Sequence, residues 1–235
     1  MDLRFSCGGI PVYLGSEWEF ERYKRMVTQP SRRRIIVAAA GLISCVFNAP
    51  AIGRVRTSGT GIVTVSAAKG ATTGTLHFNG RRYPCALGRS GIVKPKHEGD
   101  GGTPAGTFPL REVRYRADRV PQPKTGLPAI KTNPTDGWCD EPADPAYNRL
   151  VQMPYKADAE VMWREDNVYD LLAVIGYNDA PPVPGEGSAI FLHVARTAPG
   201  GSLRPTAGCI AMNEDDLLAV LSGCKPGTMI DIRAV

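Results

Sequence analysis

The fold is decided by AIFLHVA at residues 189–195 and, after a short gap, by TAGCI at residues 206–210. The first run has the length of a strand, and the side chains of a strand alternate between its two faces. One face then carries Ile190, Leu192 and Val194. His193 lies on the other face, so we predict a strand that presents a histidine on the side away from its most aliphatic surface.

Short apolar runs separated by turn residues surround this strand and predict a mostly β domain. The chain of 235 residues holds 26 Gly and 20 Pro, which favours a turn-rich fold over a helical bundle. Residues 117–154 are dense in Pro, Asp and Asn and predict a long irregular loop region. One short helix is predicted after Asn213, a favourable N-cap, and ends at Gly223. The predicted strands are 62–66, 74–79, 82–87, 107–115, 168–177 and 228–233.

Composition and charge exclude several classes of protein. Hydrophobic residues make up 43% and charged residues 22%, which is ordinary globular usage and excludes a disordered chain or a polytopic membrane protein. The net charge is +5, but only 21 basic and 19 acidic residues follow Ala51. This weak balance argues against a nucleic-acid partner, which requires clustered Lys and Arg.

Residues 1–51 have the features of an N-terminal extension followed by an export signal. Arg32–Arg34 precede an apolar run at residues 35–47, and Ala49–Ala51 supply small residues for cleavage. The run is shorter than the roughly 20 residues of a permanent transmembrane helix. The arginines resemble a twin-arginine signal, Leu42–Cys45 resembles a lipoprotein box, and Met26 is an alternative start. We therefore expect one domain at residues 52–235, located in the periplasm or cell envelope.

Cys209 and His193 are the candidate pair for chemistry. A free thiol has a pKa of about 8.5 and becomes a strong nucleophile when a histidine takes its proton. Gly208 permits a tight backbone turn that aims N–H groups at an oxyanion, as acyl transfer requires. The alternative is that Cys209 is a core cysteine and His193 a hydrogen-bonded strand residue.

Three further elements, together with this pair, carry a resemblance to a known family. These are Gly88–Gly91, the loop Glu98–Phe108 with its TPAGTF sequence, and Thr206–Cys209. With His193, they occur in the order found in the L,D-transpeptidase family with a YkuD-type catalytic domain. The resemblance covers roughly residues 62–232 and implies a β-barrel or sandwich with little helix.

The resemblance also implies an activity and roles for individual residues. It implies a cysteine acyltransferase that attacks peptidoglycan tetrapeptide stems, with Cys209 as nucleophile and His193 as base. Thr206 would shape the loop, and the N–H groups of Gly208 and Cys209 would form the oxyanion hole. An amine from a second stem would then resolve the thioester into a crosslink. No metal or cofactor is implied.

The candidates for substrate binding are Arg89, whose planar guanidinium suits a stem carboxylate, and Tyr177 and Asn178 near the turn before His193. Alternative functions are a peptidoglycan hydrolase of the same fold (an L,D-carboxypeptidase, endopeptidase or amidase) and a non-catalytic envelope-binding module.

Two positions depart from the family's pattern. Ala207 stands where a histidine is common, and Ala211 stands where Arg or Asn is common. Both lie beside the nucleophile in sequence, so we expect them to affect substrate orientation or the choice of acceptor. Pro199–Gly201 is expected to shape the entrance, and a disulfide between Cys85 and Cys139 is permitted in an oxidising compartment.

Overall fold

A computed structural model describes residues 61–235. The predicted export signal, Met26 and the boundary at residue 52 lie outside the described residues. Among the described residues, no helix is both long and apolar enough to cross a membrane. The strands are β1 (Ile62–Ala67), β2 (Thr73–Phe78), β3 (Arg81–Ala86), β4 (Ile92–Val93), β5 (Thr103–Pro104), β6 (Gly106–Tyr115), β7 (Ala129–Lys131), β8 (Asp136–Cys139), β9 (Leu150–Gln152), β10 (Ala159–Val161), β11 (Leu171–Ile175), β12 (Phe191–Val194), β13 (Ile210–Met212) and β14 (Met229–Ala234), and the helix is α2 (Glu214–Ser222).

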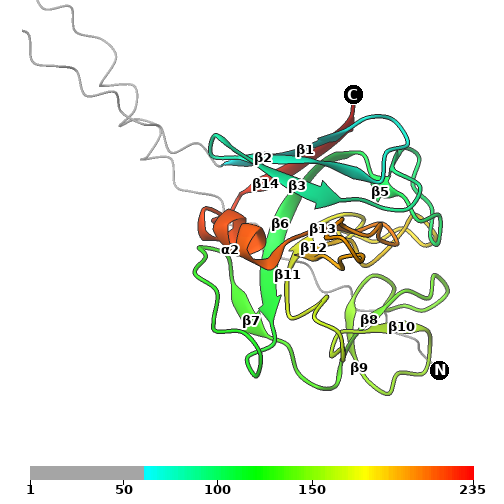
Figure 1. Cartoon of the computed structure of the whole chain (residues 1–235). Coiled ribbons are helices and arrows are strands. Elements are labelled where there is room, and N and C mark those ends of the chain that lie inside the picture. Colours follow the sequence, from blue (N-terminus) through cyan, green and yellow to red (C-terminus); the bar gives the residue numbers. More distant parts are fainter. Residues whose placement is uncertain (1–60) are drawn as a thin grey trace, which may run out of the picture. The chain divides into compact units, whose positions relative to one another are not determined.

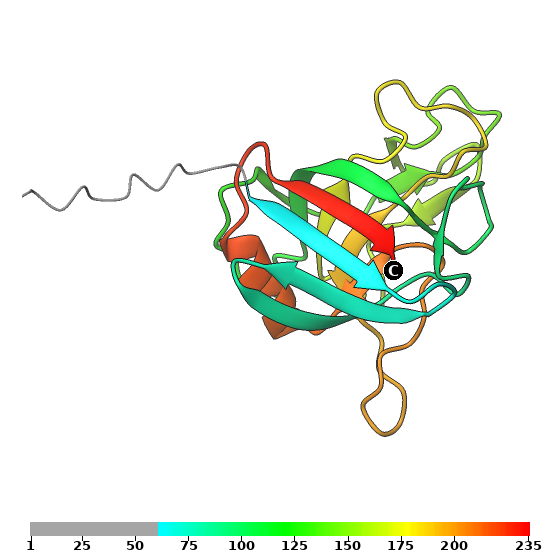
Figure 2. The ribbon, with the colours of Figure 1, turned by 90° about the horizontal axis from the view of Figure 1, so that it is seen from above.

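The main sheet closes into a barrel, which confirms the predicted fold class. Its order is β11-β12-β13-β3-β2-β1-β14-β6-β7, and an additional pairing of β11 with β6 joins the two sides. β7 is attached outside this ring, on β6. Figures 1 and 2 show β1, β14 and β6 side by side along one wall of the barrel. Closure leaves few unpaired strand edges in the ring.

The predicted strands 62–66, 74–79 and 82–87 form β1, β2 and β3, a meander whose strands pair antiparallel in chain order. The turn between the last two lies at Asn79–Gly80, as the sequence indicates. The last strand of the chain, β14, returns to pair in parallel with β1 from Ile62↔Met229 to Ala67↔Ala234. Residues at the two ends of the described chain therefore complete one wall of the barrel.

The predicted irregular region at residues 117–154 is partly regular, so the prediction was wrong in part. β8 pairs with β9 and with β10, which makes a small three-stranded sheet. These strands have only three or four residues each, too few for the alternating pattern to be recognised from sequence. A buried ion pair between Arg114 of β6 and Asp136 of β8, at 3.1 Å, joins this small sheet to the barrel.

The alternation predicted for β12 is confirmed. Leu192 and Val194 belong to the main core inside the barrel. Phe191 belongs to a second cluster with Tyr169, Cys209 and other residues, which Trp138 of the small sheet joins from one side. His193 packs against Tyr169 as well, with ring centroids 5.4 Å apart. The outer face of β12 is therefore covered by the small sheet and its connecting segments.

The predicted helix is α2, and its start differs in one respect from the expectation. The side chain of Asn213 makes no capping hydrogen bond, although its carbonyl accepts the first helical hydrogen bond from Leu217. The strand β13 lies between Cys209 and the helix in the chain. The helix buries Leu217, Val220 and Leu221 in the main core.

We expect Leu217→Ala to lower the free energy of unfolding by about 2–5 kcal/mol, because Leu217 is fully buried in the barrel core and its truncation leaves a cavity. Leu218, its partly buried neighbour, is the matched control. Urea denaturation of both variants tests this. Equal losses for Leu217→Ala and Leu218→Ala would contradict the placement of the helix.

Candidate active site

Cys209 and His193 meet at one cavity. They lie on neighbouring chain segments, because β12 and β13 pair in parallel with Leu192 opposite Ile210 and His193 opposite Ala211. Cys209 directly precedes β13. Because it lies two residues before Ala211, the residue opposite His193, its side chain is on the same face of the sheet as that of His193. Both side chains are buried and both line a cavity of about 420 Å³. The arrangement brings together the two residues that the sequence singles out.

The hydrogen bond of His193 determines which ring nitrogen is free. Nδ1 lies 2.8 Å from the carbonyl oxygen of Val194, which can only accept, so Nδ1 carries the proton. Nε2 is then the unprotonated nitrogen, able to take a proton from a nucleophile. Burial lowers the pKa of His193 to about 4. The imidazole is therefore neutral and basic at neutral pH.

Cys209 is a neutral thiol in this environment. Its Sγ donates to the carbonyl oxygen of Ala189 at 3.2 Å and accepts from the N–H of Phe191 at 3.4 Å. Burial, with a smaller contribution from the negative charge of Glu160, raises the pKa of the thiol to about 12. The thiol hydrogen is therefore directed at the carbonyl of Ala189 in this structure.

The loop before the cysteine is held by the hydroxyl of Thr206. Oγ1 of Thr206 donates to the carbonyl of Cys209 at 2.6 Å and accepts from the N–H of Gly208 at 3.1 Å. The φ of Gly208 is +148°, and a Cβ there would lie 2.9 Å from the carbonyl oxygen of Gly102. Both its backbone angle and this close approach require glycine.

These contacts distinguish the two N–H groups of the predicted oxyanion hole. The N–H of Gly208 donates to the hydroxyl of Thr206 in this structure. The N–H of Cys209 makes no hydrogen bond within residues 61–235. It is the donor that remains for a developing negative charge next to the sulfur.

The Gly-rich loop 98–106 supports the cysteine loop from the other side. Thr103 accepts a hydrogen bond from the N–H of Gly88 at 2.8 Å, and its hydroxyl lies 3.5 Å from the carbonyl oxygen of Cys209. A Cβ at Gly88 would lie 2.2 Å from the carbonyl oxygen of Gly101. The motifs at residues 88–91, 98–108 and 206–209 are thus parts of one packed unit.

The structure separates the three predicted substrate-binding residues. Arg89 lines the cavity, and its guanidinium donates to the carbonyl of Gly99 at 3.0 Å. Tyr177 and Asn178 do not line it. Tyr177 donates to Glu186, and Asn178 bonds to Val183 and Gly187, so both hold the loop that precedes β12.

The two departures from the family's pattern have different surroundings. Ala207 is exposed and lines the cavity. Ala211 is fully buried and packs with Ala86 and Ala195, so it does not reach the site. Ala207 is thus placed to contact a ligand in the cavity, whereas Ala211 is not among the residues that line it.

Pro199–Gly201, expected to shape the entrance, belong to the loop at residues 196–205 and do not line the cavity. Thr197 and Leu203 form a bridge, and Figure 2 shows this orange loop extending from the barrel. Arg196 and Arg204 at its base line the cavity, whereas Pro199, Gly200 and Gly201 do not.

Sequence reasoning missed most of the cavity's charged side chains. The segments that carry them are far apart in the chain and have no shared motif. The small sheet contributes Asp140 and Glu160, and loops between other strands contribute the rest. These charged side chains are Lys96, Glu98, Asp140, Glu160, Arg164, Arg196 and Arg204.

The comparison with known families agrees with this geometry. The family model described as the L,D-transpeptidase catalytic domain, YkuD, matches residues 63–232. The chain belongs to the L,D-transpeptidase family. No curated protein sequence matches it.

Three solved structures are similar to this L,D-transpeptidase domain at low identity. They are L,D-transpeptidase 1 of Mycobacterium tuberculosis (13% identity, TM-score 0.32), LdtMt1 in complex with imipenem (14%, 0.36) and an L,D-transpeptidase from Mycobacterium smegmatis (18%, 0.31). The matches cover 73%, 74% and 74% of this chain, and 62%, 59% and 59% of those chains. This chain therefore spans about 60% of the length of the solved structures it matches.

The other cysteines of the L,D-transpeptidase domain are not bonded to one another. Cys85, Cys139 and Cys224 are free thiols, like Cys209, so no disulfide joins the meander to the small sheet. Among residues 61–235, no group of three or more His, Cys, Asp or Glu side chains is placed to hold a metal ion.

The role of Thr206 in this domain is testable by removing only its hydroxyl. We expect Thr206→Val to lower the free energy of unfolding by about 1–3 kcal/mol, because the N–H of Gly208 and the carbonyl of Cys209 lose their shared partner. Thr206→Ser keeps the hydroxyl and is the control. Urea denaturation checks the difference, and equal stability of the two variants would show that the loop does not depend on these bonds.

Proposed function

We propose that this protein is an exported L,D-transpeptidase that acts on peptidoglycan tetrapeptide stems through a thioester on Cys209. The bond cleaved is the one between the third residue, an L-centred diamino acid, and the terminal D-alanine. The observation that carries the proposal is that Cys209 and His193 line one cavity, while Nε2 of His193 and the N–H of Cys209 have no hydrogen-bond partner within residues 61–235. These are the nucleophile, base and oxyanion donor that acyl transfer requires.

In the first half-reaction His193 takes the thiol proton at Nε2 while Sγ attacks the carbonyl carbon. The carbonyl electrons move onto oxygen, which the N–H of Cys209 stabilises. The C–N bond then breaks, and the imidazolium returns the proton to the amine of the departing D-alanine. The product is a thioester between Cys209 and the third residue of the donor stem.

In the second half-reaction an amine of another stem attacks the thioester. His193 takes the proton of that amine, the C–S bond breaks, and the proton returns to the sulfur. A new amide crosslink forms and the Cys209 thiol is restored. If water attacks instead, the product is a tripeptide stem and the enzyme acts as an L,D-carboxypeptidase.

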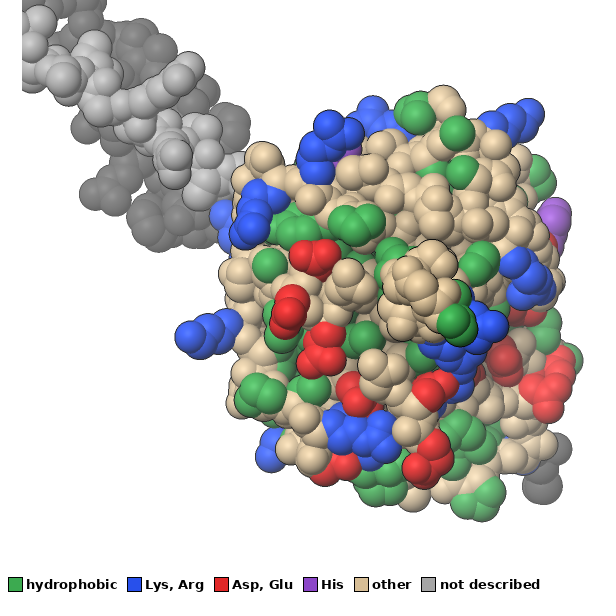
Figure 3. Space-filling model, viewed as in Figure 1, with side chains coloured by type: hydrophobic (Ala, Val, Ile, Leu, Met, Phe, Trp, Pro, Cys, Tyr) green, Lys and Arg blue, Asp and Glu red, His purple; other side chains and the backbone are tan. Residues whose placement is uncertain are grey.

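Arg89 and Arg204 are suited to hold the carboxylates of the stem. Both line the cavity, and neither forms an ion pair with a carboxylate among residues 61–235. A guanidinium binds a carboxylate through two parallel hydrogen bonds. On the face shown in Figure 3, basic and acidic side chains are interspersed and form no continuous basic patch. This distribution supports a small charged ligand in the cavity more than a long polyanion.

The proposed site of action is the periplasm or cell envelope. Its support is the sequence of residues 32–51, where three arginines, an apolar run and small residues follow one another. Peptidoglycan stems are found outside the cytoplasmic membrane, so the proposed substrate and the proposed export signal agree.

The pH dependence of kcat/KM should reflect the burial of His193. The base is active when neutral, and its pKa is lowered to about 4, so the rate should fall as the pH drops through about 4 rather than through 6.5. Initial rates of D-alanine release between pH 3.5 and 9, with folding monitored by circular dichroism at each pH, test this. Half-loss of activity near pH 6.5 would contradict a neutral buried imidazole.

The reaction itself is tested by mass spectrometry of products from a disaccharide tetrapeptide. We expect a crosslinked dimer lacking one D-alanine, complete loss of product in Cys209→Ala, and a loss of at least about 100-fold in His193→Ala. Tripeptide alone would make the protein a carboxypeptidase, and release of peptide from sugar would make it an amidase. Product that persists in Cys209→Ala would contradict the thioester mechanism.

A further inference from the structure

The sulfur of Cys209 is held by a short stretch of backbone at the start of β12. Sγ donates to the carbonyl oxygen of Ala189 at 3.2 Å and accepts from the N–H of Phe191 at 3.4 Å. A cysteine side chain turns about one torsion angle, which has three staggered positions. Because both contacts are made to backbone atoms of residues 189–191, this segment determines which of these positions the sulfur takes.

Ala189 has a backbone conformation that alanine rarely adopts. Its φ is +51°, in the left-handed region, which is unfavourable for a residue with a Cβ. A residue keeps such a conformation only when its surroundings hold it there. The direction of the carbonyl that the thiol contacts therefore depends on the groups that hold Ala189.

The side chain of Asn148 is the group that binds Ala189. Its Oδ1 accepts from the N–H of Ala189 at 3.1 Å and from Nε1 of Trp138 at 2.9 Å. Its Nδ2 donates to the carbonyl oxygens of Tyr177 at 3.0 Å and Asn178 at 2.7 Å. These bonds use both lone pairs of the amide oxygen and both N–H groups of the amide nitrogen. The amide thus ties the small sheet, the end of β11 and the start of β12 to one another.

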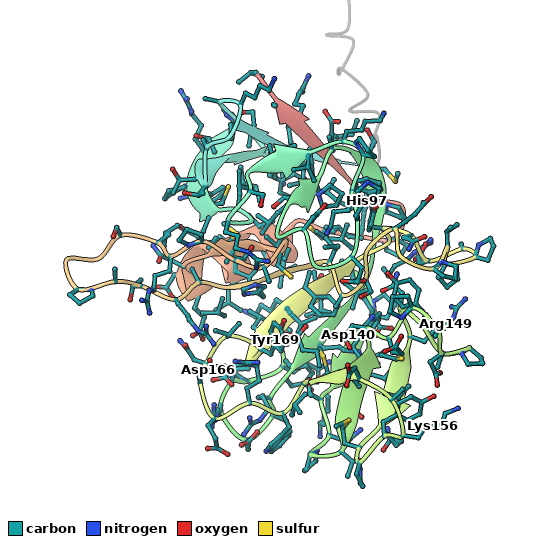
Figure 4. All side chains as sticks on the ribbon, turned by 90° about the vertical axis from the view of Figure 1, so that its right-hand side faces the viewer. His97, Asp140, Arg149, Lys156, Asp166 and Tyr169 are labelled. Carbon is teal, nitrogen blue, oxygen red and sulfur yellow. The ribbon has the colours of Figure 1, made fainter. Side chains whose placement is uncertain are left out.

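Asn148 is itself fixed in place and lies outside the cavity. Its side chain is 5% exposed, and its N–H donates to the carbonyl of Cys139 at 2.8 Å. Figure 4 shows Asp140 and Arg149, which follow these two residues in the chain, both in the region of the small sheet. Asn148 is not among the residues that line the cavity. It can therefore act on the thiol through Ala189, but not by touching a ligand beside Cys209.

We propose that Asn148 is a positioning residue for the nucleophile: it holds Ala189 in its left-handed conformation and so aims the carbonyl that the Cys209 thiol contacts. The inference rests on the proposed function, because it concerns the nucleophile of that reaction. A reacting group held in one geometry reacts faster than one that samples several. The small sheet thus contributes to the chemistry from a position outside the cavity.

Asn148→Gly tests the proposal, because glycine accepts the φ of +56° at this position and the change removes only the side chain. The readout is the S–H stretching band of Cys209, obtained as the infrared difference between each protein and the same protein with Cys209→Ala. We expect the band to move to higher frequency and to broaden in Asn148→Gly, because the thiol loses a fixed acceptor. An unchanged band would overturn the proposal.

Leu217→Ala is the control for a loss of stability alone. Leu217 is fully buried in the barrel core and does not line the cavity. This variant should lose stability and keep the S–H band of the wild type. If it shifts the band as much as Asn148→Gly does, the band follows general stability and the proposal is wrong.

Amide hydrogen exchange in the wild-type protein tests the same contact without any variant. The N–H of Ala189 donates to a buried side chain, so we expect it to exchange with deuterium oxide as slowly as the N–H groups within β12, measured by NMR. Exchange as fast as that of exposed turns would overturn the proposal, whether or not Asn148→Gly folds.

Turnover adds a kinetic readout. We expect kcat for D-alanine release to fall about 10- to 100-fold in Asn148→Gly while KM stays within about twofold, because the sulfur is displaced and the cavity lining is unchanged. A raised KM with unchanged kcat would overturn the proposal, since it would assign Asn148 to substrate binding. Absence of D-alanine release from the wild type would instead contradict the proposed function, and the infrared band and the exchange rate would still decide whether Asn148 positions the thiol.

Discussion

The parallel pairing of β12 with β13 is the constraint on which the site depends. It places Leu192 opposite Ile210, so one register brings His193 and the residue before β13, Cys209, to the same outer face of the barrel. A shift of one residue would turn His193 into the aliphatic core and Leu192 out toward the small sheet. The aliphatic residues inside the barrel thus determine the orientation of the histidine outside it.

The small sheet supplies further side chains to the site on the outer face of the barrel. It packs Trp138 against Phe191, with ring centroids 5.2 Å apart, and brings Asp140 and Glu160 to the cavity. Asn148, which is buried, accepts from Trp138 and from the N–H of Ala189. Ala189 is the acceptor of the Cys209 thiol. Residues of the connecting segment therefore influence both the burial of the thiol and the hydrogen bond that holds it.

The resting electrostatics follow from that burial. A thiol with a pKa raised to about 12 and an imidazole with a pKa lowered to about 4 are both uncharged at neutral pH. The proposed mechanism accordingly generates the nucleophile during attack, by general-base catalysis, and does not start from a thiolate–imidazolium pair. The charges in the cavity belong instead to arginines and carboxylates that surround this neutral pair.

Local sequence patterns determined the strands β1 to β3, the alternation of β12, the position of α2 and the pairing of Cys209 with His193 as candidates. Period-two alternation and the order of three motifs are properties of neighbouring residues, so they can be recognised without a fold. Only the tertiary structure decided that the N–H of Cys209 has no partner while that of Gly208 is bonded. It also decided that Ala211 is buried while Ala207 is exposed, and that Asp140 and Glu160 reach the cavity. These facts depend on contacts between segments far apart in the chain, such as the closeness of Gly208 to Gly102 and the docking of Asp136 on Arg114. No pattern of adjacent residues encodes which distant segments will meet.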